Sequence, residues 1–293
     1  MAGEASKSIP KEVLWGGGRS PFSMSYGKMM MWFFLLSDAL TFGSLITAMG
    51  FMKFYHYDYW PNSEEVFYHF PFVSHDIHLP LLYVAFMTFI LIVSSVTMVL
   101  AVEAGHRMDK KGVVKWLALT VVGGFIFLGS QAWEWTTFIL GNGEHSTAYE
   151  LADGNIAHIR FEDKHAHFEV GENPLEAAKE AINHGAKLQV KNGVYLEGQE
   201  AIKALKGARH VSGANLKRNE YGHRLYADFF FGITGFHGFH VFSGVIINLI
   251  VLINVLRGVY HQRGHYEMVE KAGLYWHFVD LVWVFVFTFF YLV

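Results

Sequence analysis

Cysteine is missing from all 293 positions of the sequence. Its absence excludes disulfide bonds, thiolate metal sites, cysteine-ligated iron–sulfur clusters and thiol nucleophiles, so a metal site would need histidine, carboxylate or methionine ligands. Charged residues are also few, at 17%, compared with about 25% in soluble domains. The net charge of −3 provides no basic field that would attract nucleic acid, and we expect no nucleic-acid partner.

Long hydrophobic segments, by contrast, recur five times, at 29–52, 79–102, 116–140, 229–256 and 273–293. A helix needs about 20 apolar residues to cross the hydrocarbon layer of a membrane, and each segment reaches that length. The alternation that is typical of barrel strands is missing from them. The sequence therefore predicts an all-α polytopic membrane protein, built as a five-helix transmembrane bundle.

Basic residues are distributed unevenly among the short segments that connect these spans. The N-terminal segment 1–28 has four basic residues and no apolar core of a cleaved signal peptide, while the first loop, 53–78, has only Lys53. Lysine and arginine favour the cytoplasmic side. We therefore expect a cytoplasmic N-terminus and, because the number of spans is odd, an extracytoplasmic C-terminus.

Residues 141–228 form a long polar insertion between the third and fourth spans. This insertion separates two membrane portions, 29–140 with three spans and 229–293 with two. Segment 157–170 alternates like a β-hairpin, 174–184 has helical composition, and 188–196 contains an Asn-Gly turn between short β-type runs. These patterns predict a small α+β extracytoplasmic insertion.

Ionisable groups inside the spans cost free energy at the bilayer centre, so each invites a functional hypothesis. Asp38 is the only charged residue of the first span. Two interpretations stay open for it: a carboxylate that accepts protons or contacts lipid, or a buried polar group satisfied by Ser37, Thr41 or a neighbouring helix.

In the third span, Gln131 and Glu134 lie three residues apart and share one helix face. Interfacial anchoring with helix–helix hydrogen bonding is one interpretation, and proton transfer is the other. In the fourth span, His237 and His240 have the spacing of a ligand pair but lack the Glu and the i, i+4 spacing of the zinc signature. We expect hydrogen bonds to carboxylates or lipid head groups, with a metal site as the alternative.

The last span places His277 and Asp280 on one face, with Glu270 about two turns earlier. These three side chains could form one hydrogen-bonded column. Either they take part in chemistry directly, or they form a polar seam that fixes the orientation of the helix. In the fourth span, Gly232, Gly235 and Gly238 form a stripe that predicts close helix packing.

Two long motifs resemble a known family: T-G-F-H-G-F-H-V at 234–241 and E-K-A-G-L-Y-W-H-F-V-D-L-V-W at 270–283. Together with F-L-G-S-Q-A-W-E-W at 127–135, they are similar to subunit III of cytochrome c oxidase, within the haem–copper oxidases. The resemblance covers 29–140 and 225–293. Family members commonly have seven helices, the first two forming one arm of a lipid-filled cleft, so this chain resembles the shorter five-helix bacterial form.

The resemblance implies a subunit without redox cofactors of its own in a bacterial inner membrane, with haem and copper in partner subunits. It implies subunit I as the main contact, subunit II and further oxidase subunits as neighbours, and bound phospholipid, for which Arg257 is a phosphate candidate. Asp38 falls where the family usually has a membrane-embedded glutamate, and Glu270 aligns with another family glutamate. The family is associated with sustained turnover and proton uptake during the reduction of O2 to water.

Several alternatives remain at this point. Related chains accompany quinol oxidases and nitric oxide reductases, so the electron donor is open between cytochrome c and quinol. A stand-alone metal protein would use His237, His240 and His277, and a proton transporter would use Asp38, Glu134 and Asp280. The insertion is a candidate docking site for an electron carrier or another respiratory complex. Its histidines are expected to be scattered surface residues rather than metal ligands: His158, His165, His167, His184 and His210.

Overall fold

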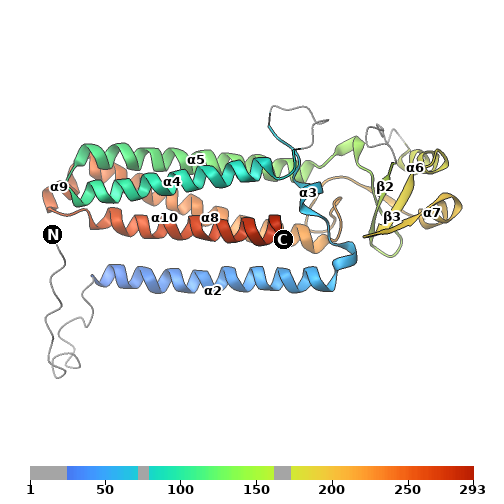
Figure 1. The fold of residues 1–293 in the computed structure, drawn as a ribbon, viewed down its shortest axis with the longest axis horizontal. Helices are drawn as coiled ribbons and strands as arrows, with labels where there is room; N and C mark the ends of the chain where they lie inside the picture. The colour runs from blue at the N-terminus through green and yellow to red at the C-terminus, as the bar shows by residue number, and fades with distance from the viewer. Residues whose placement is uncertain (1–24, 72–78, 162–172) are drawn as a thin grey trace, which may run out of the picture.

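The computed structural model describes residues 25–71, 79–161 and 173–293. Five long helices run side by side, and a small sheet with two short helices lies beyond one end of them (Figure 1). Each predicted span overlaps one of these helices over most of its length, and all five helices are long and apolar enough to cross a membrane. The predicted fold class, a five-helix bundle with a small α+β insertion, is confirmed. We call the two ends of the bundle the sheet end and the opposite end.

The helices are longer than the hydrophobic segments because their polar ends continue the same backbone hydrogen bonding. Ser25 caps the first helix by accepting from the Lys28 N–H group, and Asp109 caps the third by accepting from the Lys111 N–H group. The spans are α2 (Tyr26–Tyr55), α4 (Leu82–His106), α5 (Lys110–Leu140), α8 (Arg224–Leu256) and α10 (Glu267–Val286), the last continued by the π-helical turn η3 (Phe287–Leu292). Short connecting elements are η1 (Tyr57–Tyr59), α3 (Ser63–Val66), η2 (Gly143–His145) and α9 (Val259–Arg263).

Two tryptophans of α10 form the centre of the bundle. Trp276 and Trp283 are fully buried, and their indole N–H groups donate to Ser94 Oγ at 3.2 Å and Thr88 Oγ1 at 2.9 Å on α4. Gly124 of α5 and Gly244 of α8 leave room for the Trp276 ring. A Cβ at Gly124 would lie 2.7 Å from this ring, and a Cβ at Gly244 would lie 3.0 Å from it. Glycine thus sets how closely α5 and α8 approach α10.

The prediction that Gly232, Gly235 and Gly238 of α8 allow close packing against another helix of the chain is largely wrong. Only Gly235 faces a neighbour closely, with Trp135 3.0 Å from the place of a Cβ, whereas a Cβ at Gly232 or Gly238 would meet nothing within 4 Å. Residues three apart rotate by about 60° around a helix relative to one another. The stripe therefore drifts off the contact line, and Gly244 takes the role of the close-packing residue.

Helix α2 lies at the edge of the bundle and packs more loosely than the other spans (Figure 1). Only 11% of its most hydrophobic window is buried, compared with 33% or more in each other span. Its buried residues are Leu35, Phe42 and Met49, which recur every seven residues and form one narrow line of contact. Apolar packing therefore holds α2 weakly, and polar contacts take a larger share.

The insertion contains one antiparallel sheet with strand order β4-β3-β2-β1-β5. Its strands are β1 (Ala148–Glu150), β2 (Ile156–Arg160), β3 (Lys187–Lys191), β4 (Val194–Leu196) and β5 (Arg209–Val211). Helices α6 (Pro174–Asn183) and α7 (Gly198–Ala204) pack on one face through a core that includes Ile159, Ile182 and Leu188. The predicted Asn-Gly turn joins β3 to β4, and Gly193 has the φ of +76° that favours glycine.

The predicted hairpin at 157–170 is wrong in its pairing. Strand β2 pairs with β1 on one edge and with β3 on the other, so neither edge is open to the residues that follow it. The rest of that prediction, 162–172, lies outside the described residues. Period-two alternation identified the strand but not its partners, because alternation reports a buried face and carries no information on pairing.

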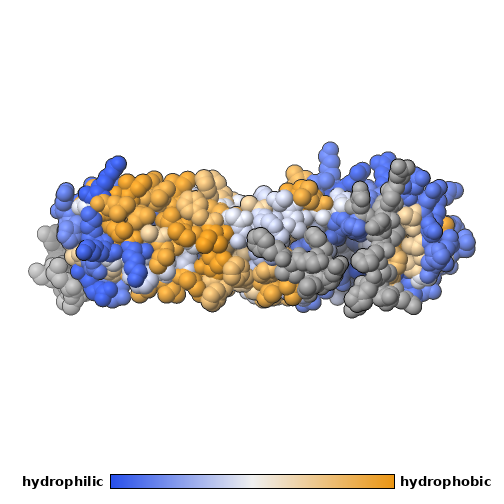
Figure 2. All heavy atoms as spheres, turned by 90° about the horizontal axis from the view of Figure 1, so that it is seen from above, coloured by the Kyte–Doolittle hydropathy of each residue, from blue (hydrophilic) through white to orange (hydrophobic). Residues whose placement is uncertain are grey.

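Hydrogen bonds fix the insertion to the sheet end of the bundle. The Ala214 N–H group donates to the Phe138 carbonyl of α5 at 3.2 Å, and the Asn192 amide donates to the Trp60 carbonyl at 3.1 Å. Glu220 is 3% exposed, and its carboxylate accepts from the Asn142 N–H group at 3.1 Å. Figure 2 shows hydrophobic residues over the helices and hydrophilic residues over both ends, as spans that cross a membrane require.

Candidate functional site

A carboxylate and a histidine meet between α2 and α8. Asp38 Oδ2 lies 3.1 Å from His240 Nε2, and both side chains are largely buried, at 15% and 8% exposure. Ser37 and Thr41, which were alternative partners of Asp38, donate instead to carbonyls of their own helix. Asp38 is thus placed against a neighbouring helix, in a pair that joins the loosely packed α2 to the bundle.

The hydrogen bonds of this pair determine where its protons lie. The Nδ1 atom of His240 is 2.8 Å from the Phe236 carbonyl, which can only accept, so Nδ1 carries a proton. The contact between Nε2 and Asp38 is therefore a hydrogen bond between α2 and α8, and the Phe42 ring lies edge-on to the histidine ring with 5.6 Å between the ring centroids.

The other histidine of the motif points to a different helix. His237 is fully buried, and its Nε2 atom donates to the Val279 carbonyl of α10 at 3.1 Å. Its ring packs against Trp283 and Phe127, and Nδ1 has no hydrogen-bond partner. The two rings of the predicted pair therefore diverge, one towards α10 and one towards α2.

Gln131 and Glu134 form a buried network near the sheet end of the bundle. The Gln131 amide donates to Glu134 Oε2 at 2.7 Å, and the Tyr291 hydroxyl donates to the same oxygen at 3.1 Å. Glu134 is 4% exposed, and its Oε1 atom has no partner. The network joins α5 to the last turn of the chain, as the helix–helix interpretation expects.

Glu270 lies at the opposite end of the bundle, where it makes an ion pair with Lys28 at the start of α2. His106 Nε2 is 3.3 Å from its other carboxylate oxygen. His277, seven residues later, contacts Ser95 of α4 instead, with Oγ and Nδ1 2.7 Å apart. Glu270 is therefore separate from His277 and Asp280, and the predicted column of all three is wrong. Seven residues of helix rise by about 10 Å, and Lys28 and His106 are nearer partners for Glu270.

Arg257 is exposed and forms the C-cap of α8, where its backbone N–H group donates to the Ile253 carbonyl. Its guanidinium can therefore reach a ligand outside the chain, such as a phosphate. No group of three or more histidine, aspartate or glutamate side chains within 25–71, 79–161 and 173–293 has the arrangement of a metal site.

The histidines of the insertion are dispersed among its elements. His158 lines a cavity, His210 Nε2 lies 2.9 Å from the Ser146 carbonyl, and His184 is an exposed C-cap of α6. His165 and His167 lie outside the described residues. Of the five histidines named from the sequence, the three that the structure describes therefore have separate surroundings.

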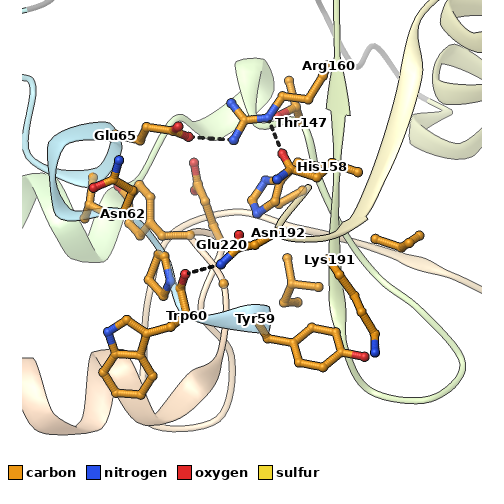
Figure 3. A pocket seen from close by; sticks show the side chains of 18 of the residues that line it. Tyr59, Trp60, Asn62, Glu65, Thr147, His158, Arg160, Lys191, Asn192 and Glu220 are labelled. Carbon is orange, nitrogen blue, oxygen red and sulfur yellow. Dashed lines mark hydrogen bonds and ion pairs between the residues drawn. The ribbon is translucent and has the colours of Figure 1, made fainter. Parts of the chain in front are cut away.

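A cavity of about 280 Å³ lies between the polar face of the sheet and the residues that follow α2 (Figure 3). Each charged side chain that lines it has a partner. Arg160 donates to Glu65 at 2.5 Å, Lys191 Nζ lies 3.6 Å from Asp58 Oδ2, and Glu220 accepts from backbone N–H groups. The cavity is thus a polar junction between the insertion and the bundle.

Burial shifts the titration of the groups around this junction. Desolvation, and to a smaller degree the charge of Arg160, lowers the pKa of His158 to about 3. Desolvation raises the pKa of Glu220, against the backbone N–H groups of Gly213 and Asn142, which favour its ionised form. Desolvation, followed by the charge of Glu220, raises the pKa of Tyr68 to about 12.

We expect acid to weaken this junction through His158. The pKa of His158 is about 3 in the folded state, below the unfolded value of 6.5. Its contribution to the free energy of unfolding is therefore complete above pH 6.5 and is lost as pH falls towards 3. At pH 5 the loss is about 2 kcal/mol. Glu220 has the opposite effect on the pH dependence of stability, because a raised pKa favours the folded state at lower pH.

The measurement is hydrogen exchange of the β2 amides between pH 7 and pH 5, corrected for the intrinsic pH dependence of exchange. The wild-type chain should lose protection on acidification, and His158→Gln should lose much less. The matched control is His184→Gln, at an exposed site on α6. Equal acid sensitivity in the wild type and in His158→Gln would contradict the assignment.

Comparison with known proteins finds similarity to one family. The sequence model of the family Cytochrome c oxidase subunit III matches residues 219–293, which contain α8, α10 and both histidine motifs. Cytochrome c oxidase subunit 3 of Thermostichus vulcanus is 24% identical over 259 residues, 88% of this chain and 83% of that protein. The chain is thus similar to subunit III of cytochrome c oxidase, most strongly in its last two spans.

Higher identities are confined to a short part of the chain. The Synechocystis subunit 3 is 44% identical over 68 residues, 23% of this chain and 29% of that protein. The probable subunit 3 of Rickettsia conorii is 45% identical over 69 residues, 23% of this chain and 24% of that protein. The five apolar helices and these matches support a multi-pass membrane protein that is similar to subunits of an oxidase complex.

Sequence reasoning missed the partners of several site residues. Ser95, Tyr291, Lys28 and His106 contact predicted site residues from other helices. Lys28 carried a usable signal, since it is a basic residue directly before the first span. Ser95 and Tyr291 carried none, because their contacts depend on which helices are neighbours.

Proposed function

We propose that the chain is the non-catalytic subunit III of a proton-pumping terminal oxidase, a cytochrome c oxidase that reduces O2 to water. The observation that carries the proposal is the family match over 219–293, because that segment holds His237, His240, His277 and Asp280. Haem and copper then belong to partner subunits, of which subunit I is the main contact and subunit II a neighbour. Quinol as the electron donor is the alternative, which the match does not address.

The role of the chain in the complex is to stabilise the catalytic subunit and to hold phospholipid. The narrow contact line of α2 supports lipid binding, since exposed apolar side chains such as Phe33 and Leu40, at 62% and 70%, need an acyl environment. Arg257, exposed at the end of α8, supports a phosphate contact. Asp38 and His240 support a proton-holding role at the edge of the bundle.

The proposed orientation places the N-terminus and the Glu270 end in the cytoplasm of a bacterial cell. The C-terminus and the insertion 141–228 are then extracytoplasmic. Lys110, Lys111 and Lys115 at the start of α5 support this orientation through the preference of basic residues for the cytoplasmic side. An insertion on that outer side is where an electron carrier or a neighbouring respiratory complex would dock.

The test compares the purified oxidase with and without this chain. We expect the complex that lacks the chain to keep its haem spectrum and its initial rate of O2 consumption, and to lose activity after fewer turnovers. Loss of a haem band in proportion to the missing chain would contradict the non-catalytic assignment. Deletion of 145–218 separates the insertion from the bundle: turnover should persist, with weaker binding of the donor.

A further inference from the structure

A polar cluster lies on one face of the bundle, where α4 and α10 meet. Ser95 Oγ is 2.7 Å from His277 Nδ1, and the same hydroxyl lies close to the Asp280 carboxyl group. All three side chains are partly buried, so part of each reaches the surface of the chain. This cluster differs from the Asp38–His240 pair and the Glu134 network, which are enclosed between helices.

The cluster lies at the depth where a polar group is least favourable. Ser95 is close to the midpoint of α4, Leu82–His106, and Asp280 is close to the midpoint of the span Glu267–Leu292. A charged side chain at the bilayer centre costs about 2.5–3.5 kcal/mol on insertion scales. A partly exposed aspartate at this depth therefore needs a polar neighbour.

The chain itself does not satisfy Asp280. Its Oδ1 atom is buried without a hydrogen-bond partner, and none of the ion pairs formed by the described residues includes its carboxyl group. Acyl chains have no hydrogen-bond donor, and lipid head groups lie about 15 Å from the bilayer centre. A donor to the exposed part of the carboxyl group therefore has to come from another membrane-spanning segment.

Apolar side chains surround the cluster on the same faces of the two helices. Ile92 and Val99 lie three and four residues from Ser95, at 44% and 53% exposure, and Val284 lies four residues from Asp280, at 37%. A polar spot within an exposed apolar rim has the composition of a helix–helix contact in membranes, where hydrogen bonds add to van der Waals packing.

We propose that Ser95, His277 and Asp280, with the rim of Ile92, Val99 and Val284, form the docking surface for a membrane-spanning helix of a partner subunit. That helix carries a side-chain hydrogen-bond donor at mid-depth, which reaches the exposed part of the Asp280 carboxyl group. The inference rests on the proposed function, since it assumes a membrane-embedded partner, and it adds which face of this chain meets that partner.

The absence of cysteine makes the face directly testable. Val284→Cys places one thiol on the rim, and Val122→Cys, 53% exposed on α5, is the matched control. Each variant is assembled in native membranes and modified with a thiol-reactive photocrosslinker. We expect Val284→Cys to capture a membrane subunit of the complex and Val122→Cys to give at least fivefold less of that product. Equal capture at both sites, or lipid adducts alone at Val284→Cys, would overturn the proposal.

Substitution of Asp280 tests the chemistry of the contact. Asp280→Asn keeps an acceptor of the same size and should retain the partner, whereas Asp280→Leu should reduce the partner that co-purifies by about tenfold. If the wild-type chain brings down no oxidase subunit, the proposed function fails. If it does, but Asp280→Leu retains the partner and Val284→Cys captures none, only the docking face is wrong.

Discussion

Leucine at position 124 is expected to prevent α5 from packing against α8 and α10. A Cβ at Gly124 alone would lie 2.6 Å from Val245 Cγ2 and 2.7 Å from Trp276 Cη2, and a leucine adds three more carbon atoms. Trp276 is 1% exposed and hydrogen-bonded to Ser94, so its ring has nowhere to move. Overpacking of this kind costs about 3 kcal/mol or more. The thermal unfolding midpoint in lipid nanodiscs should fall by roughly 5 °C or more.

The control for this substitution is available on the same helix. Gly129 is exposed, and a Cβ there would meet nothing within 4 Å. Gly129→Leu changes helix propensity and hydrophobicity in the same way as Gly124→Leu but introduces no clash. An equal fall in the unfolding midpoint for the two variants would show that packing against Trp276 is not what limits the approach of the helices.

Replacing His240 with leucine is expected to weaken the attachment of α2 to the bundle. The substitution leaves Asp38 without its partner at a site that is 15% exposed, inside a membrane span. Removing one member of a buried pair costs about 3–5 kcal/mol, because the remaining charge stays uncompensated. With only three buried residues on α2, apolar contacts cannot offset the loss. Cross-linking between α2 and α8 through introduced cysteine pairs should fall sharply.

A double-mutant cycle distinguishes loss of the polar interaction between Asp38 and His240 from the effect of changing the shape of the two side chains. The variant with both Asp38→Leu and His240→Leu removes both polar groups and should recover most of the cross-linking lost in His240→Leu. His240→Gln retains a donor towards Asp38 and should lie near the wild type. A double variant whose defect equals the sum of the two single defects would show that Asp38 and His240 do not act as a pair.

The sequence predicted the parts of the fold that depend on local pattern. Hydropathy located all five spans, and the Asn-Gly pair located the turn at Gly193, because both signals are contained within one segment. The pairing of β2 with both β1 and β3 was out of reach, since pairing depends on segments far apart in the chain. Helix geometry already implies that glycines three residues apart turn gradually away from one line along α8. The prediction overlooked this because it treated equal spacing as a shared helix face.

The same division applies to the candidate site. Ionisable residues in apolar segments identified Asp38, Glu134 and His240, because such groups stand out against their surroundings. The partner of Asp38 lies 202 residues away on α8, and no spacing rule connects the two. Glu270 and His277 share a helix face yet have different partners, Lys28 and His106 for Glu270 and Ser95 for His277. Site residues were therefore predictable one by one, and their partners required the arrangement of the bundle.

The central claim is that this chain is one subunit of a haem–copper oxidase. The most direct measurement is to purify the chain through an affinity tag in a mild detergent and identify every co-purifying subunit by mass spectrometry, with a visible spectrum of the same sample. Our account predicts a haem–copper subunit I in near one-to-one amount and the haem bands that belong to it. Recovery of the chain without a haem–copper subunit, or haem bands that stay with the chain after subunit I is removed, would contradict it.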